Sequence, residues 1–202
     1  MKRLLLPISF LYSCVLFLRH KLYDWNILKS KSYDIPNICV GNLNLGGTGK
    51  TPHIEYLIRL LSNKYDIAVL SRGYGRKTKG FLLANESHTH NDIGDEPLQY
   101  FTKFDNIKIA VDENRCEGME RLLQDENPPQ IILLDDAYQH RKIKPGLNIL
   151  LTDYYYLYSD NHLVPAGNLR DIKKAAQRAE IIVITKSPNV ITPYYRKDVE
   201  NK

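Results

Sequence analysis

Beyond an N-terminal segment, short apolar runs alternate with stretches in which apolar residues recur at helical spacing. Six runs predict strands, at Asn37–Val40, Asp66–Leu70, Ile107–Val111, Gln130–Leu134, Leu147–Leu151 and Ile181–Thr185. After the first of these, Ile54, Leu57, Ile58 and Leu61 form one face of a helix predicted over Thr51–Ser62. Strands that are apolar along their whole length are typical of a parallel sheet with helices on both faces. The pattern therefore predicts an α/β fold.

The N-terminal segment, residues 1–31, has a different pattern. Its apolar run, Leu4–Leu18, is shorter than the ~20 residues needed to cross a bilayer. One face of the predicted helix carries Ile8, Leu11, Val15, Leu18, Leu22 and Trp25, and another carries Ser9, Ser13, His20 and Asp24. We predict a basic amphipathic helix that lies on an anionic leaflet. A cleaved signal peptide, a short tilted span and a helix buried on the domain are the open alternatives.

The net charge of +5 is confined to this N-terminal segment. Residues 1–31 hold six basic residues against Asp24 alone, which leaves 22 basic and 22 acidic residues in the rest of the chain. A neutral domain lacks the basic surface of a nucleic-acid-binding protein, so no nucleic-acid partner is expected, and no protein partner is predicted. The three cysteines lie far apart and form no metal-binding spacing, which favours a reducing compartment.

The stretch Asn37–Thr51, NICVGNLNLGGTGKT, is typical of a strand followed by a phosphate-binding loop and a helix. In such a loop, open backbone N–H groups and the positive end of the helix bind phosphate, a lysine contacts the β- and γ-phosphates, and a hydroxyl ligates Mg²⁺. The predicted nucleotide contacts are Asn44, Leu45, Gly46, Gly47, Thr48, Gly49, Lys50 and Thr51. Asn44 stands where the strict pattern has glycine. Gly46 and Gly47 are expected to supply the flexibility, and asparagine tolerates a left-handed backbone.

Three carboxylates lie where they can serve this site. Asp135 and Asp136 end the apolar run IILL. Two adjacent carboxylates repel each other unless a cation is present, so at least one of them is predicted to ligate Mg²⁺, directly or through water. Asp95, in the motif GDEP, comes just before a predicted helix. It either caps that helix or accepts a proton from a hydroxyl nucleophile, and the spacing alone does not decide.

Arginines follow other predicted strands, at the ends where parallel sheets bind ligands. The loop SRGYGR comes after the second strand and places Arg72, Tyr74 and Arg76 either around a substrate phosphate or in a solvated turn. Arg115 follows the third strand and is either a phosphate ligand or one half of a surface ion pair. The turn LVPAGNLR ends at Arg170, a further candidate for substrate binding.

The segment TKSP, at the end of the last predicted strand, bears on the choice of nucleotide. It is similar to the T-K-x-D motif of GTP-binding proteins, whose aspartate reads guanine. Pro188 stands in the place of that aspartate, so guanine recognition is not supported and ATP is the predicted nucleotide.

Together, GNLNLGGTGKTP, SRGYGR, GDEP, ILLDDAYQHRK and LVPAGNLRD resemble the tetraacyldisaccharide 4′-kinases of lipid A biosynthesis, in order and over nearly the whole chain. The resemblance implies a P-loop NTPase-like fold that uses ATP and Mg²⁺. It implies transfer of the γ-phosphate to the 4′-hydroxyl of a tetraacylated glucosamine disaccharide 1-phosphate, which gives lipid IVA. It also implies a place at the cytoplasmic face of the bacterial inner membrane.

The resemblance assigns roles by matching positions. Asp95 matches the catalytic base of the family, which favours the base over the helix cap. The residues that match its phosphate-binding, Mg²⁺-binding and substrate-binding positions are Lys50, Thr51, Asp135, Asp136, Arg115 and Arg170.

Members of the family continue past ITKSP into a second lobe, which supplies a histidine paired with the catalytic aspartate. This chain stops at Lys202, and none of its six histidines occupies that place. We therefore expect a fragment or truncated product in which residues 32–202 form the N-terminal kinase domain. Two other hypotheses are a membrane-associated P-loop ATPase switch and a nucleotide-binding fragment without turnover.

Overall fold

A seven-stranded sheet runs through the centre of the computed structural model, which describes residues 2–200. Its strand order is β3-β4-β2-β5-β1-β6-β7. The strands are β1 (Asn37–Asn42), β2 (Ile67–Ser71), β3 (Leu82–Leu83), β4 (Ile107–Val111), β5 (Ile131–Asp135), β6 (Leu147–Asp153) and β7 (Ile181–Thr185). All pairings are parallel except that of β3 with β4. The mostly parallel sheet predicted from the sequence is therefore confirmed.

All six predicted strands form, and each ends within two residues of its predicted bounds. The strand that the sequence analysis missed is β3, which pairs antiparallel with the end of β4. It contains only two residues, too few for an alternating or continuous apolar pattern to stand out. β1 lies between β5 and β6, so the loop after β1 opens at the middle of the sheet edge.

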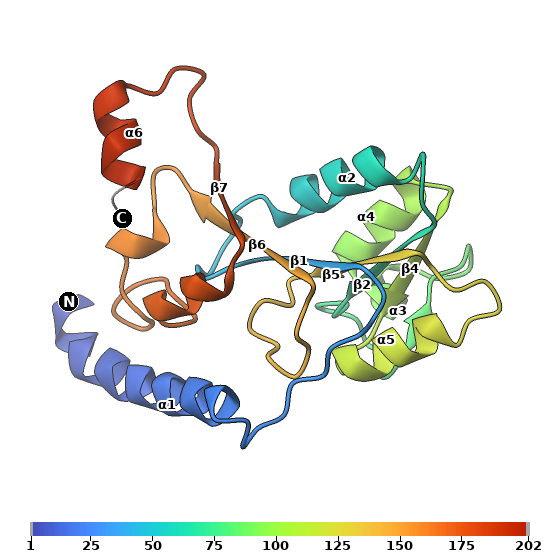
Figure 1. Cartoon of the computed structure of the whole chain (residues 1–202), viewed down its shortest axis with the longest axis horizontal. Helices are drawn as coiled ribbons and strands as arrows, with labels where there is room; N and C mark the ends of the chain where they lie inside the picture. Colours follow the sequence, from blue (N-terminus) through green and yellow to red (C-terminus); the bar gives the residue numbers. More distant parts are fainter. Residues whose placement is uncertain (1, 201–202) are drawn as a thin grey trace.

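Helices cover both faces of the sheet (Figure 1). Ile54 and Ile58 of α2 and Tyr100 of α4 join the apolar cluster on one face, and Met119 and Leu122 of α5 join the cluster on the other. The helices are α1 (Leu6–Asp24), α2 (Lys50–Leu61), α3 (His90–Ile93), α4 (Asp95–Lys103), α5 (Arg115–Leu123) and α6 (Pro193–Glu200), with 3₁₀ turns η1 (Lys2–Leu5), η2 (Tyr158–Asp160) and η3 (Lys173–Arg178). The two-faced packing follows from strands that are apolar on both sides.

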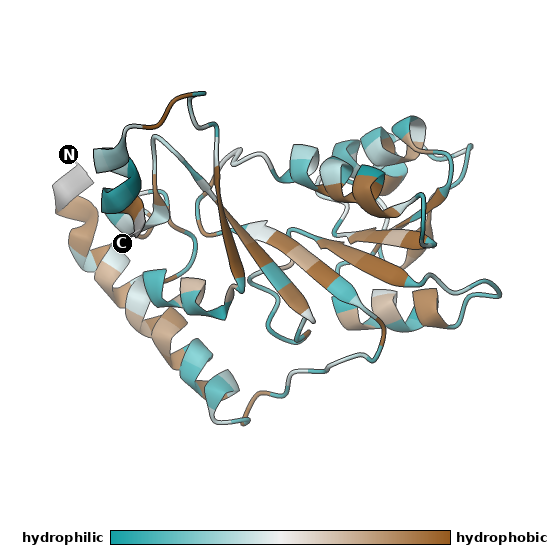
Figure 2. Cartoon of the chain, turned by 45° about the horizontal axis from the view of Figure 1, so that its top comes forward, coloured by the Kyte–Doolittle hydropathy of each residue, from teal (hydrophilic) through white to brown (hydrophobic). Residues whose placement is uncertain are grey.

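Helix α1 lies apart from the sheet, beside η3, and the side that it packs against the domain carries both polar and apolar residues, with Leu16 and Tyr23 buried there (Figure 1). Ser9 and His20 are buried there, and the Ser9 hydroxyl donates to the main-chain oxygen of Leu163 at 3.0 Å. The opposite side is apolar and exposed, as the brown colour along α1 shows in Figure 2. Its exposed residues are Ile8, Phe10, Leu11, Val15, Phe17 and Leu18. None of the helices within residues 2–200 combines the length and apolar character that crossing a bilayer requires.

Gly41 in β1 offers a test of the packing that supports the phosphate loop. A Cβ added at Gly41 would lie 2.5 Å from the Cβ of Tyr138, a buried side chain whose hydroxyl donates to Ala175 at 2.7 Å. Gly41→Ala is therefore expected to lower the free energy of unfolding, measured in urea, by about 1–3 kcal/mol. Gly47→Ala is the matched control, because nothing lies within 4 Å of its added Cβ. Equal losses in the two variants would contradict this close contact.

Candidate active site

The loop between β1 and α2 leaves its main-chain N–H groups open. Gly46 and Gly49 have φ angles of 109° and 84°, in the left-handed region that glycine adopts without strain. Within residues 2–200, the N–H groups of Gly46, Gly47, Thr48 and Gly49 have no hydrogen-bond partner, and no side chain caps the start of α2. Such a loop at a helix N-terminus is a binding site for phosphate.

Asn44 does not serve as a substitute for the glycine of the strict pattern, and the expectation that it takes a left-handed backbone is wrong. Its Nδ2 atom instead donates to the main-chain oxygen of Tyr156 at 3.0 Å, and its backbone pairs with Leu169. The conformational freedom comes from the glycines alone. Asn44 fixes the root of the loop against the segments that follow β6.

Asn42, which the sequence analysis did not single out, holds the loop together through hydrogen bonds of its side chain. Its Nδ2 atom donates to the Thr48 hydroxyl at 2.7 Å and to the Gly46 oxygen at 3.3 Å. Its Oδ1 atom accepts from Arg170 at 2.5 Å, and its main-chain oxygen accepts from Gln139 at 2.7 Å. The sequence feature that could have indicated this role is a polar side chain directly after the apolar run ICVG.

Lys186 is a second contact that sequence reasoning missed. Its Nζ atom lies 2.7 Å from the Gly47 oxygen and 2.7 Å from the Asp153 carboxylate. From the sequence, the motif TKSP bears only on recognition of the base. Because β7 ends at the same edge of the sheet as β1, the lysine that follows β7 reaches the outer side of the phosphate loop.

The two aspartates at the end of β5 lie beside this loop, since Asp135 is in register with Val40 of β1. The side chain of Asp135 is buried, its Oδ2 atom accepts from the Tyr100 hydroxyl at 3.3 Å, and its Oδ1 atom has no partner within the described chain. Burial, together with the nearby carboxylates of Glu96 and Asp136, raises the pKa of Asp135 to about 7. A buried carboxylate oxygen without a partner is a position that a cation fits.

Asp136 has a different environment. Its backbone is left-handed, with a φ of 49°, which turns the carboxylate toward Lys50 Nζ at 3.8 Å and toward Arg170, whose Nη1 donates to it at 3.0 Å. Burial alone would raise the pKa of Asp136, but the hydrogen bond and charge of Arg170, with the charge of Lys50, hold it below its ordinary value. One aspartate of the pair is thus neutralised by the protein, and the other is not.

The donor set fits Mg²⁺ held together with a nucleotide better than a resident metal ion. Within residues 2–200, no three His, Cys, Asp or Glu side chains are grouped so that they could hold a metal. Mg²⁺ needs no such cage, because it usually binds one or two carboxylates together with substrate phosphates and water. The free oxygen of Asp135 and the hydroxyl of Thr51 supply that kind of set.

Helix α4 brings two further carboxylates to the site. The Thr51 hydroxyl lies 3.4 Å from the Glu96 carboxylate. Asp95 is exposed at the first position of α4; Gly94 occupies the N-cap position, and no side chain caps the helix, so the helix-cap interpretation of Asp95 is wrong. Within the described chain, no residue pairs with the Asp95 carboxylate. Glu96 is the neighbour in GDEP to which the sequence analysis gave no role.

The loop Arg72–Arg76 packs against the turn that carries Asp95. A Cβ added at Gly94 would lie 2.9 Å from the main-chain oxygen of Tyr74. The side chains of Arg72 and Tyr74 are exposed beside that turn. The side chain of Arg76 is only 4% exposed. Its guanidinium donates to the main-chain oxygen of Gly80 at 2.7 Å and pairs with Glu113. Arg76 therefore fastens the loop, and its contact with a substrate stays a prediction.

Arg115 lies under the acidic pair and not on the surface. Its side chain is 3% exposed, and its guanidinium donates to the main-chain oxygens of Asp112 and, at 3.2 Å, of Asp135. Burial lowers the pKa of Arg115 to about 10 despite the neighbouring aspartates. The surface ion pair considered for Arg115 is wrong, while its contact with nucleotide phosphates stays a prediction.

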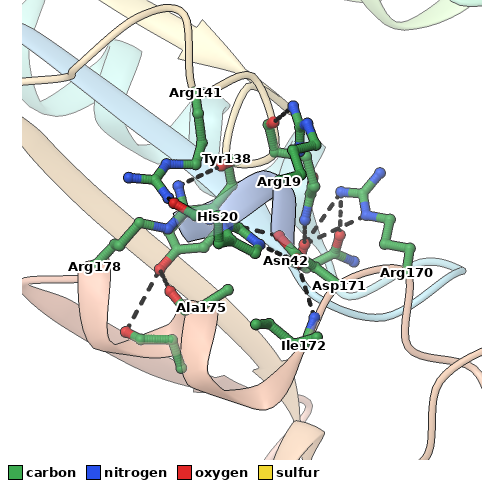
Figure 3. Close-up of polar contacts among 12 residues, drawn as sticks. Arg19, His20, Asn42, Tyr138, Arg141, Arg170, Asp171, Ile172, Ala175 and Arg178 are labelled. Carbon is green, nitrogen blue, oxygen red and sulfur yellow. Dashed lines mark hydrogen bonds and ion pairs between the residues drawn. The ribbon is translucent and has the colours of Figure 1, made fainter. Parts of the chain in front are cut away.

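Helix α1 contacts the segment that places Arg170 in the site (Figure 3). The Tyr12 hydroxyl donates to the main-chain oxygen of Arg170 at 3.3 Å. His20 Nε2 lies 2.6 Å from Asp171 Oδ1, and both side chains are buried. Two neighbouring residues thus face opposite ways, Arg170 toward the phosphate loop and Asp171 toward α1.

Comparison with known proteins shows which family has a sequence like that of this chain. The model of the family described as tetraacyldisaccharide-1-P 4′-kinase matches residues 1–200. The chain belongs to this family.

Curated relatives in the family include the tetraacyldisaccharide 4′-kinases of Bacteroides thetaiotaomicron and Flavobacterium johnsoniae. The first is 54% identical over 190 residues, which are 94% of this chain and 50% of the relative; the second is 51% identical over 202 residues, 100% of this chain and 59% of the relative. The chain therefore spans about half the length of the curated relatives it matches. Among solved structures, LpxK from Aquifex aeolicus in complex with ATP matches with a TM-score of 0.85 and 36% identity, over 95% of this chain and 62% of that one.

The buried pair of His20 and Asp171 allows a test of how α1 is attached. His20→Ala is expected to lower the free energy of unfolding by about 1.5–3 kcal/mol, because it removes a hydrogen bond from a fully buried carboxylate. It should also make α1 the first site of cleavage in limited proteolysis. His90→Ala is the control, because His90 is exposed and far from α1 in sequence. If His20→Ala behaves like His90→Ala in both measurements, α1 is not held by this pair.

Proposed function

We propose that the full-length protein transfers the γ-phosphate of ATP to the 4′-hydroxyl of tetraacyldisaccharide 1-phosphate, to form lipid IVA in lipid A biosynthesis. The observation that carries the proposal is the meeting, at one sheet edge, of an open phosphate loop, a buried carboxylate oxygen that no group of the described chain contacts through a hydrogen bond, and an exposed aspartate at a helix start. Membership of the kinase family and the ATP complex of the Aquifex aeolicus relative support it.

The ATP side of the proposed site is built on β1, β5 and α2. The loop N–H groups and Lys50 bind the phosphates, and Arg115 stabilises the strand end beneath them. Mg²⁺ would be held by Thr51, Asp135 and Asp136, and it neutralises charge on the transferring phosphoryl group when bound. The remaining loop residues assigned to nucleotide binding are Asn44, Leu45, Gly46, Gly47, Thr48 and Gly49.

The acceptor side faces Asp95. The 4′-oxygen of the sugar forms a bond to the γ-phosphorus while the bond from that phosphorus to the β–γ bridging oxygen breaks, and ADP leaves. Asp95 accepts the proton of the hydroxyl, a role that its free and exposed carboxylate allows. We assign Arg72, Tyr74, Arg76 and Arg170 to binding of the substrate, with Arg76 acting through the shape of its loop.

We further propose that residues 1–31 hold the protein on the cytoplasmic face of the bacterial inner membrane, and that residues 32–202 form the nucleotide-binding domain. The exposed apolar side of α1 and the positive charge of this segment fit an anionic leaflet. An enzyme placed there reaches a substrate whose acyl chains stay in the bilayer.

Asp95→Asn in the full-length protein tests the kinase assignment. It is expected to lower kcat for transfer of labelled phosphate to the lipid disaccharide by at least ~100-fold, because general-base catalysis contributes about that much or more. ATP affinity should change little, since Asp95 contacts no part of the phosphate loop. Asp105→Asn, on an exposed turn, is the control.

Two outcomes of the same assay would contradict the assignment. ATP hydrolysis by the unmodified protein without any labelled lipid would favour a membrane-associated ATPase switch. Lipid phosphorylation by Asp95→Asn at the rate of the unmodified protein would be compatible with the kinase function but would show that Asp95 is not its general base.

The membrane assignment is tested by the double variant Leu11→Glu and Leu18→Glu. Both side chains are exposed, at 67% and 56%, so the fold should tolerate the change. Co-sedimentation with vesicles containing anionic lipid is expected to fall at least ~10-fold, because two apolar contacts with the bilayer are replaced by charges of the wrong sign. The matched control changes Tyr56 and Leu60 of α2 to Glu. Equal binding by the two double variants would contradict a membrane role for α1.

A further inference from the structure

A hollow of about 140 Å³ opens between α1 and η3, and none of its lining residues belongs to the nucleotide or substrate positions described above. Four cationic side chains and an apolar edge characterise it. These are Lys21, Arg141, Lys174 and Arg178, with Phe17 and Ile172 at the edge. We call it the α1 hollow; Figure 3 shows its two arginines beside His20.

The positive charge of the α1 hollow is only partly balanced. Its lining includes one carboxylate, Asp24, which Arg141 already pairs with at 2.9 Å. Within residues 2–200, the ammonium groups of Lys21 and Lys174 make no hydrogen bond or ion pair; that of Lys21 lies 5.7 Å from the centre of the Phe17 ring. Because like charges confined in a hollow repel one another, the hollow favours an anion that brings them together.

Arg178 adds a charge that the protein holds in place. Its guanidinium stacks on the Tyr138 ring at 4.4 Å, and its Nη1 atom donates to the Tyr138 oxygen at 3.0 Å. Its Nε and Nη2 atoms are buried and donate no hydrogen bond, although Nη2 lies 3.6 Å from Asp171. Burial lowers the pKa of Arg178 even though the charge of Asp171 opposes the shift.

The position of the α1 hollow indicates what kind of anion it takes. Phe17 lines the hollow and also belongs to the exposed apolar side of α1, where it is 49% exposed. An ion that carries an apolar chain can therefore place its charge among the cations and its chain along α1. Phosphate suits such a set of donors, because lysine and arginine bind it through charge-assisted hydrogen bonds.

We propose that the α1 hollow binds the phosphate headgroup of an anionic membrane lipid, whose acyl chains lie along the apolar side of α1. The proposal rests on the membrane placement of α1 proposed above, and it adds a defined headgroup site to it. The bound lipid sets the rotation of α1 on the leaflet, and the attachment of α1 to Asp171 passes that orientation to the segment of Arg170.

The test compares two double variants of the 202-residue chain. Lys21→Gln with Lys174→Gln removes the two lysine charges of the α1 hollow. Lys29→Gln with Lys173→Gln removes the same charge from the same N-terminal segment and the same turn η3, outside the hollow. Binding is measured by co-sedimentation with phosphatidylcholine vesicles that contain either phosphatidylglycerol or oleate at matched surface potential.

The wild type and the Lys29/Lys173 variant are expected to bind the phosphatidylglycerol vesicles at least ~5-fold more tightly than the oleate vesicles. The Lys21/Lys174 variant should bind both kinds equally, since only general attraction to the surface remains. The two kinds of vesicle have the same surface potential, so general electrostatic attraction of lysines to the surface is the same for both. A difference in binding therefore reports a site that recognises the phosphate headgroup.

Three results would overturn the proposal. One is an equal preference for phosphatidylglycerol in both double variants. Another is no preference in the wild type. A third is full displacement from the phosphatidylglycerol vesicles by millimolar inorganic phosphate, compared with chloride at the same ionic strength, which would make the hollow a site for free phosphate. These outcomes are independent of the kinase assay, because neither double variant changes the phosphate loop or Asp95.

Discussion

The candidate site depends on the different environments of two adjacent carboxylates, Asp135 and Asp136, at the end of β5. Lys50 and Arg170 neutralise Asp136, while Asp135 is buried with one oxygen free and its pKa raised to about 7. Such a group lowers stability, since burying a carboxylate oxygen without a hydrogen-bond partner is costly. The imbalance is removed when a cation arrives with the phosphates. This environment fits the metal–nucleotide complex that we propose for the site.

The same segments that build the nucleotide site also attach the N-terminal helix. Arg170 reaches Asn42 and Asp136, and its neighbour Asp171 is held by His20 of α1. Because these two residues are adjacent in the backbone, we expect a shift of α1 to move the arginine beside the phosphate loop. The geometry thus links helix α1 to the sheet edge that carries the phosphate loop.

Local sequence patterns were enough to predict six of the seven strands of the sheet and the phosphate loop. The apolar runs located six strands, and GGTGKT with a following helix located the loop, because both depend on neighbours in sequence. The environments of Arg76 and Arg115 were not predictable in this way, since Glu113 and the main chain of Asp135 meet them only in the folded chain. The direction in which α1 faces was also beyond local pattern. The sequence distinguishes two faces of the helix, but contacts made only in the folded chain, such as those with Leu163 and Asp171, decide which one turns inward.

The central claim, that Asp135 awaits a cation delivered with a nucleotide, is tested by the effect of Mg²⁺ on ATP affinity. Calorimetric titration of the chain with ATP is expected to show at least ~10-fold tighter binding in the presence of Mg²⁺, and Asp135→Asn should abolish most of that gain. The variant should be folded, because it removes a buried charge. If Asp135→Asn keeps the full gain from Mg²⁺, the free carboxylate oxygen has another purpose and this account of the site is wrong.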